Sequence, residues 1–215
     1  MNFFVSNLFH DPFYFFSWVV IVAFSICFHE YAHASMAYRL GDDTAARMGH
    51  LSMNPMVQMG QTSIIMLLLI GIAWGATPVN VSRLRGRGAA AAVSFAGPAA
   101  NLLLGLIFAA ATAAASLFPE HSVDMARRFL YFGCVANGVL FVFNMLPVPM
   151  FDGWSVFSLF FPRMQWISAQ QANLISAGVL IAVFITPVGQ LIWSLGIWIG
   201  TLMVRGWANF LGLFF

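Results

Sequence analysis

Two histidines and a glutamate in the segment Ile26–Ala34 have the spacing of a metal-dependent hydrolase site. The segment contains His29, Glu30 and His33 in the order His-Glu-x-x-His. On an α-helix, residues four apart lie on one face, so the two imidazoles can bind one metal ion and Glu30 can reach a water on it. Imidazole pairs on a helix suit Zn²⁺. The pattern predicts one zinc ion per chain, bound by His29 and His33, and metal-assisted hydrolysis with Glu30 as general base.

The rarity and the location of this motif argue against coincidence. The chain has five histidines and two glutamates in 215 residues. Chance therefore produces His-Glu-x-x-His in roughly one such chain in a thousand. The motif also lies inside an apolar run from about Phe13 to Tyr38, where ionisable side chains are costly unless they are partnered. The remaining alternative is a structural pair of histidines that binds no metal.

The composition is that of an integral membrane protein. Hydrophobic residues make up 61% of the chain and charged residues 7%, whereas about a quarter of a soluble domain is charged. There is no basic patch with interleaved aromatic residues, so the predicted partner is the lipid bilayer and not nucleic acid. Cys27 and Cys134 lie in apolar runs, which predicts neither a disulfide framework nor a thiolate metal site. No basic stretch precedes the first apolar run, so we expect the first helix to be retained and not cleaved as a signal peptide.

The apolar runs predict an all-α polytopic membrane protein with about five to six transmembrane or re-entrant segments. These runs cover about residues 13–40, 62–74, 89–117, 129–146 and 172–204. The run 62–74 is too short to cross a bilayer comfortably, which favours a re-entrant or interfacial segment. The run 172–204 is interrupted at Thr186-Pro187, so it forms either a hairpin of two helices or one kinked helix. We expect a polar loop at 119–128 and an amphipathic connection at 154–171.

Arginine placement predicts the topology, because positive residues favour the cytoplasmic side. One group follows the first helix and a second group precedes the alanine-rich run: Arg39 and Arg47, then Arg83, Arg85 and Arg87. The two groups lie on one side only if residues 62–74 do not cross the bilayer. Arg127 and Arg128 fall on the opposite side and count against this topology. We expect a multi-pass membrane protein with a single domain over residues 1–215.

Asp152 is the predicted third metal ligand, because a catalytic zinc usually has three protein ligands and one open position. Other acidic and histidine side chains lie on the predicted outer side or too shallow in the loop after the first helix: Glu120, His10 and His121, then Asp42, Asp43 and His50. Asp152 follows a helix broken at Pro147 and Pro149, and broken backbone at membrane depth is tolerated where it lines a cavity. The alternative is that Pro-x-Pro only ends a helix and that Asp152 is a loop acid.

Small and polar residues recur on one face of the alanine-rich run. Ser94, Gly97, Asn101 and Gly105 follow helical spacing. Small residues on a membrane helix let neighbouring helices approach closely. The spacing therefore predicts a packing face.

Together these motifs resemble the site-2 protease family of intramembrane zinc metalloproteases. That family combines His-Glu-x-x-His with a later Asn-x-x-Pro-x-Pro-x-x-Asp-Gly, and both are complete here, at His29–His33 and Asn144–Gly153. Gly97-Pro-Ala-Ala-Asn101 is similar to the family's Gly-Pro-x-x-Asn segment. The polar loops 49–55 and 74–80 are similar to those of small members without a PDZ domain. The resemblance covers about residues 13–160. It implies a catalytic core of three helices in that part of the chain and a protein of a prokaryotic cell membrane.

The resemblance implies a role for each matching residue. His29, His33 and Asp152 would bind zinc, and Glu30 would activate the water. Asn144 would position the substrate backbone or stabilise the oxyanion, with an interhelical hydrogen bond as the equal alternative. The substrates would be transmembrane segments of other proteins. Short membrane-associated β strands in the loops could hold such a substrate extended, and 48–53 and 78–82 are the candidates.

Two other functions remain open at this stage. A zinc or proton transporter could use the same histidines and aspartate, although transporters usually carry ionisable residues along a path and often contain inverted repeats. No repeat is visible in this sequence. An inactive scaffold that binds transmembrane helices is the second alternative, and Glu30 argues against it because a pure binder needs no general base. Assembly into a homo-oligomer is not excluded.

Overall fold

The computed structural model describes residues 4–212, and these form helices joined by loops and turns. The helices that are long and apolar enough to span a membrane number four in this part of the chain. They are α2 (Pro12–Arg39), α6 (Ala89–Ala115), α7 (Glu120–Asn144) and α10 (Val188–Phe210). Two shorter apolar helices are α5 (Gly60–Ile70) and α9 (Ala169–Ile185). The prediction of an all-α polytopic membrane protein is confirmed.

The remaining helical elements are short and lie in the connections. They are η1 (Phe4–Ser6), α1 (Asn7–His10), α3 (Thr44–Arg47), α4 (Pro55–Gln58), η2 (Val81–Arg83), α8 (Asp152–Ser158) and η3 (Pro162–Trp166). The apolar run 172–204 is divided between α9 and α10, which meet at Thr186 and Pro187. Pro187 supplies no backbone N–H and fixes its own φ, so the helix ends before it and a new one begins.

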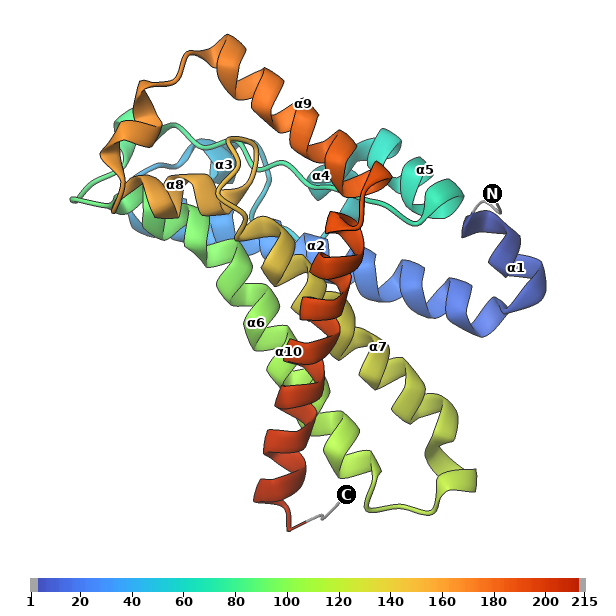
Figure 1. The fold of residues 1–215 in the computed structure, drawn as a ribbon. Helices are drawn as coiled ribbons and strands as arrows, with labels where there is room; N and C mark the ends of the chain where they lie inside the picture. The colour runs from blue at the N-terminus through green and yellow to red at the C-terminus, as the bar shows by residue number, and fades with distance from the viewer. Residues whose placement is uncertain (1–3, 213–215) are drawn as a thin grey trace.

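Helices α6, α7 and α10 pack side by side, and α2 crosses them and contacts both α6 and α7 (Figure 1). Two glycines let α7 and α10 approach closely. A β-carbon at Gly138 would overlap the carbonyl oxygen of Gly196, and one at Gly196 would lie 2.7 Å from the backbone nitrogen and Cα of Val139. Close backbone approach of this kind is how membrane helices gain dispersion energy, since lipid tails offer no hydrophobic drive for association.

The loop after α2 is fixed by a buried carboxylate. Asp42 accepts hydrogen bonds from the Thr44 hydroxyl (2.5 Å) and from the Asn80 backbone N–H (2.6 Å). Burial opposes ionisation of Asp42, but these hydrogen bonds and the nearby Arg83 hold the pKa of the carboxyl below its ordinary value. Asp42 thereby joins the end of α2 to the segment 71–80, which contacts Glu30 through Thr77.

The predicted β strands are not found in residues 4–212. Residues 48–53 form turns and bends. Gly49 has φ +81 there, and the Gln58 amide donates to the carbonyls of His50 (2.8 Å) and Ser52 (2.5 Å). In the candidate 78–82, η2 begins at Val81 with an Asn80 side-chain cap. Residues 72–80 have no helix or strand assignment, and Figure 1 shows them as an extended trace that leaves α5. Within residues 4–212 no neighbouring strand completes a ladder with them, and a strand needs one.

The predicted loop at 119–128 is also wrong, because α7 already begins at Glu120. Pro119 precedes the first turn, and Asp124 pairs with Arg128 four residues later (3.0 Å). Ion pairs at this spacing stabilise a helix terminus. The charges that indicated a loop are therefore the solvated first turns of a membrane-length helix.

We predict that Gly196→Ala destabilises the protein, because the added methyl group has no space against Val139. Overpacking costs roughly 1–3 kcal/mol, measurable as a lower Tm in detergent micelles. Gly206→Ala on the same helix is the control, since no atom lies within 4 Å of its β-carbon and alanine favours helix. Equal melting temperatures for the two variants would contradict the packing described here.

We predict that α5 does not cross the bilayer, because its 11 residues extend only about 16 Å against a hydrocarbon core of about 30 Å. Residues 47 and 85, both exposed, should then lie on one side. Arg47→Cys and Arg85→Cys, in a background with alanine at the buried Cys27 and Cys134, should react with an impermeant thiol reagent from the same side. Reaction from opposite sides would overturn the topology.

Candidate active site

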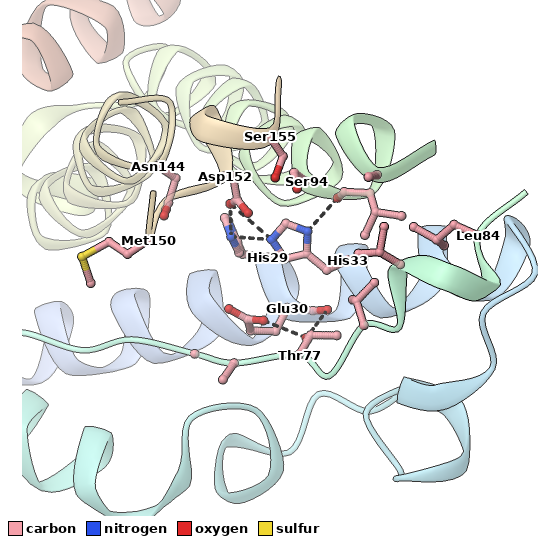
Figure 2. Close-up of a pocket in the computed structure, with 16 residues that line it drawn as sticks. His29, Glu30, His33, Thr77, Leu84, Ser94, Asn144, Met150, Asp152 and Ser155 are labelled. Atoms are coloured by element: carbon pink, nitrogen blue, oxygen red, sulfur yellow. Dashed lines mark hydrogen bonds and ion pairs between the residues drawn. The ribbon is translucent and has the colours of Figure 1, made fainter. Parts of the chain in front are cut away.

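His29 and His33 lie one turn apart on α2 and are both buried. Their Nε2 atoms are 2.9 Å apart and point to the same space (Figure 2). Each ring is held from behind by a hydrogen bond at Nδ1. The partner of His29 is the Asn101 side-chain oxygen at 2.6 Å, and the partner of His33 is the Val93 carbonyl at 2.7 Å, both on α6. The histidine pair therefore presents two ring nitrogens in a fixed orientation.

Asp152 completes a cluster of three candidate metal ligands. Its Oδ2 lies 3.1 Å from Nε2 of His29 and 3.3 Å from Nε2 of His33. Zinc bonds of about 2.0–2.1 Å at tetrahedral angles separate two ligand atoms by about 3.3 Å. The three donor atoms thus have the chemistry and spacing of one face of a zinc tetrahedron. Among the described residues, His29, His33 and Asp152 are the three metal-ligating side chains that lie close enough together to hold one ion.

The break between α7 and α8 places Asp152 in this cluster. α7 ends at Asn144, and α8 begins at Asp152 itself. A β-carbon at Gly153 would overlap the carbonyl oxygens of Met145 and Leu146, so glycine lets the start of α8 fold back onto the end of α7. The proline-broken segment thus brings the Asp152 carboxylate to 3.1 Å from His29 and 3.3 Å from His33.

Glu30 is buried beside the histidines and contacts the extended segment 71–80. The Thr77 hydroxyl lies 2.7 Å from the Glu30 side-chain oxygen Oε2 and 3.1 Å from the Glu30 carbonyl. A β-carbon at Gly75 would overlap the Glu30 carboxylate. Gly75 therefore leaves room for this side chain and Thr77 orients one of its oxygens.

The face of α6 that the sequence assigned to helix packing lies against His29 and His33. A β-carbon at Gly97 would overlap Nε2 of both His29 and His33, so α6 approaches the site through a glycine. Asn101 contacts His29, and Ser94 lines the cavity. Only Gly105, beside Asn137 and Met203, has a purely packing environment. The spacing of these residues was visible in the sequence, but their contact with the histidines was not.

The cluster opens into a cavity of about 310 Å³ lined by the three candidate ligands, Glu30, the extended segment and the start of α8. Asn144, Met150 and Ser155 also line it (Figure 2). The Asn144 amide donates to the Leu140 carbonyl of its own helix at 3.0 Å. Within residues 4–212, the Asn144 side chain has no hydrogen bond to another helix.

The other acidic and histidine side chains considered from the sequence do not join the cluster. Asp42 is held by Thr44 and Asn80, and His50 lies 3.2 Å from the Gln58 side-chain oxygen. Asp43 pairs with Arg47 and Arg83. His10 and His121 lie at the end of α1 and the start of α7.

Comparison with known proteins finds bacterial relatives that are named as metalloproteases. "Putative zinc metalloprotease YwhC" of Bacillus subtilis is 32% identical over 182 residues, which cover 80% of this chain and 81% of the relative. "Putative zinc metalloprotease Rip2" of Mycolicibacterium smegmatis is 36% identical over 138 residues, 60% of this chain and 51% of the relative. The Mycobacterium tuberculosis Rip2 is 35% identical over 140 residues, 61% and 52% of the two chains. This chain spans about half the length of the Rip2 proteins.

No family model and no solved structure matches the chain. The names of the relatives specify zinc, which confirms the predicted cofactor. The donor set of two imidazoles and one carboxylate fits that metal.

We predict that Gly97→Ala prevents zinc binding, because its methyl group would occupy the space between the two Nε2 atoms. Zinc per protein after mild chelation should fall to near the blank value. Gly105→Ala is the matched control on α6, since its β-carbon would be 3.2 Å from the flexible side chain of Met203, and it should retain zinc. Full zinc content in Gly97→Ala would show that the metal binds elsewhere.

Proposed function

This chain belongs to the site-2 protease family of zinc metalloproteases, and from that premise we propose that it is an intramembrane endopeptidase. In this proposal it hydrolyses peptide bonds in or near transmembrane segments of other membrane proteins. The observation that carries the proposal is the convergence of His29, His33, Asp152 and Glu30 on one cavity among membrane-length helices. Because the relatives are bacterial, we place the protein in a prokaryotic cell membrane as a multi-pass protein.

His29, His33 and Asp152 would hold the zinc ion in this mechanism. Two neutral imidazoles and one carboxylate leave a net charge of about +1 on the complex. A bound zinc ion supplies a Lewis acid that polarises the scissile carbonyl and lowers the pKa of water. The buried site strengthens every such electrostatic interaction, because little water is present to screen it.

Glu30 is the proposed general base. It accepts a proton from the attacking water and can return that proton to the leaving amine. The Thr77 hydroxyl donates a hydrogen bond to Oε2 of Glu30 (2.7 Å), so Oε1 would be the oxygen that contacts the water. Asn144 lines the same cavity, and its amide is the proposed group that positions the substrate backbone or stabilises the oxyanion.

The extended segment beside Glu30 supports a role in substrate binding. Its Trp74 N–H and carbonyl both bond to the Ser63 hydroxyl, and the Ala76 N–H donates to the Gln58 carbonyl. In an extended chain, alternate residues direct their backbone groups to opposite sides. The N–H groups of Gly75, Thr77 and Val79 lack hydrogen-bond partners within residues 4–212, and all three residues line the cavity.

This free edge can bind an unwound substrate by strand addition. A transmembrane helix hides its peptide groups in its own hydrogen bonds, so it must unfold locally before hydrolysis. Pairing with the backbone at 75, 77 and 79 would replace those lost bonds next to Glu30. The segment would therefore act as a strand only when a substrate completes the ladder.

We predict that Glu30→Gln keeps zinc and loses hydrolysis, because it removes the base while leaving the three candidate ligands. General-base removal costs about 10²–10⁴-fold or more. The measurement is cleavage of a model transmembrane substrate in micelles, with zinc content measured on the same samples. An inactive helix-binding scaffold or a transporter predicts no cleavage by the wild-type protein.

The control is Asp124→Asn, which also removes one carboxylate charge but lies near the start of α7, paired with Arg128. It should cleave at the wild-type rate. Cleavage by Glu30→Gln at a rate close to wild type would overturn the proposed mechanism.

A further inference from the structure

Three buried polar side chains that the mechanism does not use form a network behind His29. They are Ser25 on α2, Asn101 on α6 and Asn137 on α7, and each has an exposure of 0%. Every buried side-chain nitrogen or oxygen in the described part of the chain has a hydrogen-bond partner. The polar atoms of the two buried asparagines are therefore all hydrogen-bonded, and their bonds connect α7, α6 and α2.

The hydrogen bonds form a continuous chain from α7 to His29. The Asn137 amide nitrogen contacts the Gly133 carbonyl (2.9 Å) and the Ser25 hydroxyl (2.9 Å). The Asn101 amide nitrogen donates to the Asn137 side-chain oxygen at 3.0 Å. The Asn101 oxygen in turn lies 2.6 Å from Nδ1 of His29.

The Gly133 carbonyl determines which group donates and which accepts in each of these hydrogen bonds. A backbone carbonyl can only accept, so the Asn137 atom facing Gly133 must be the NH₂ group. The Asn137 oxygen then faces Asn101 and requires a donor there, which fixes the Asn101 amide as well. The Asn101 oxygen therefore faces His29. Because this oxygen can only accept, Nδ1 of the His29 ring must carry the proton of their hydrogen bond.

We infer that Asn101 and Asn137 are positioning residues that select the Nδ1–H form of His29 and so leave its Nε2 lone pair free for zinc. This inference rests on the zinc site of the proposed function. Hydrogen-bond partners behind a metal-ligating histidine set its tautomer and ring orientation and raise its basicity. Here the orientation of the His29 ring depends, through Asn101 and Asn137, on the Gly133 carbonyl of α7. The packing of α6 against α7 therefore affects a candidate ligand on α2.

Loss of this network should change zinc affinity, whereas loss of an ordinary interhelical hydrogen bond changes only stability. A hydrogen bond that only holds two membrane helices together contributes modestly to stability. Loss of the Asn101 oxygen also frees the His29 ring to rotate or to protonate Nε2. Zinc affinity should therefore fall in excess of any effect on folding.

The test compares Asn101→Leu, which removes the acceptor and keeps the branched shape of the side chain, with Asn137→Leu, which removes a side chain that has no hydrogen bond to His29. Zinc affinity is measured by chelator competition on purified protein in micelles, and the Tm of the zinc-free protein is measured alongside. We expect Asn101→Leu to weaken zinc binding by about 10–100-fold. Asn137→Leu should weaken it by less, since Asn101 keeps its oxygen but loses the contact that orients it.

Thr112→Val is the matched control, because Thr112 is a buried polar residue of α6 that donates only to the Phe108 carbonyl of its own helix. It should bind zinc as the wild type does. Wild-type affinity in both asparagine variants overturns the positioning role but leaves the zinc site intact. A wild-type protein that binds no zinc overturns the proposed function and, with it, this inference.

A second measurement needs no substitution and so does not depend on the variants folding. In zinc-loaded wild-type protein, ¹⁵N chemical shifts of the histidine rings distinguish the protonated nitrogen from the metal-bound one. We expect His29 to carry its proton at Nδ1 and to bind through Nε2. Binding through Nδ1 would overturn the inference, because the Asn101 oxygen could then receive no hydrogen bond from that ring.

Discussion

Desolvation of polar side chains among apolar helices is the physical constraint on which the active site depends. His29, Glu30, Asn101 and Asn137 are all buried, and a polar group at membrane depth is costly unless it is bonded. Each is paired with a group on another helix or on the segment 71–80. The same pairings that make burial tolerable also orient the side chains. The geometry of the candidate site and the stability of the helix core therefore depend on the same hydrogen bonds.

Glycines decide how closely the elements that carry these groups approach one another. Gly97 brings α6 against the two histidines, Gly153 folds the start of α8 onto the end of α7, and Gly75 lets the extended segment lie on Glu30. A side chain at any of these positions would separate two elements by the width of a methyl group or more. Because metal ligands must converge within a few ångströms, the absence of a β-carbon at these sites is a requirement of the chemistry.

The segment 71–80 links the fixed core to the part of the site that would contact substrate. One of its edges is anchored to Ser63 and Gln58, and the other lies free along the cavity. Its end is fixed by the bond from Asn80 to Asp42. This arrangement leaves backbone groups available next to the proposed base without exposing them along the whole segment, which limits the cost of unpaired hydrogen-bonding groups.

The sequence by itself determined the membrane class, the helical architecture and the residues that could do chemistry. Hydrophobic run lengths require long helices in a bilayer, and the motif spacings place His29 beside His33 and a carboxylate after a proline break. It did not determine the contacts between segments far apart in the chain. Gly97 and Asn101 were assigned to packing, and residues 48–53 and 78–82 to strands, because local spacing records which face a residue occupies but not what lies opposite. Only the tertiary structure brought α6 and segment 71–80 onto α2, and hydrogen bonds to Asn101 and Thr77 exist only where those surfaces meet.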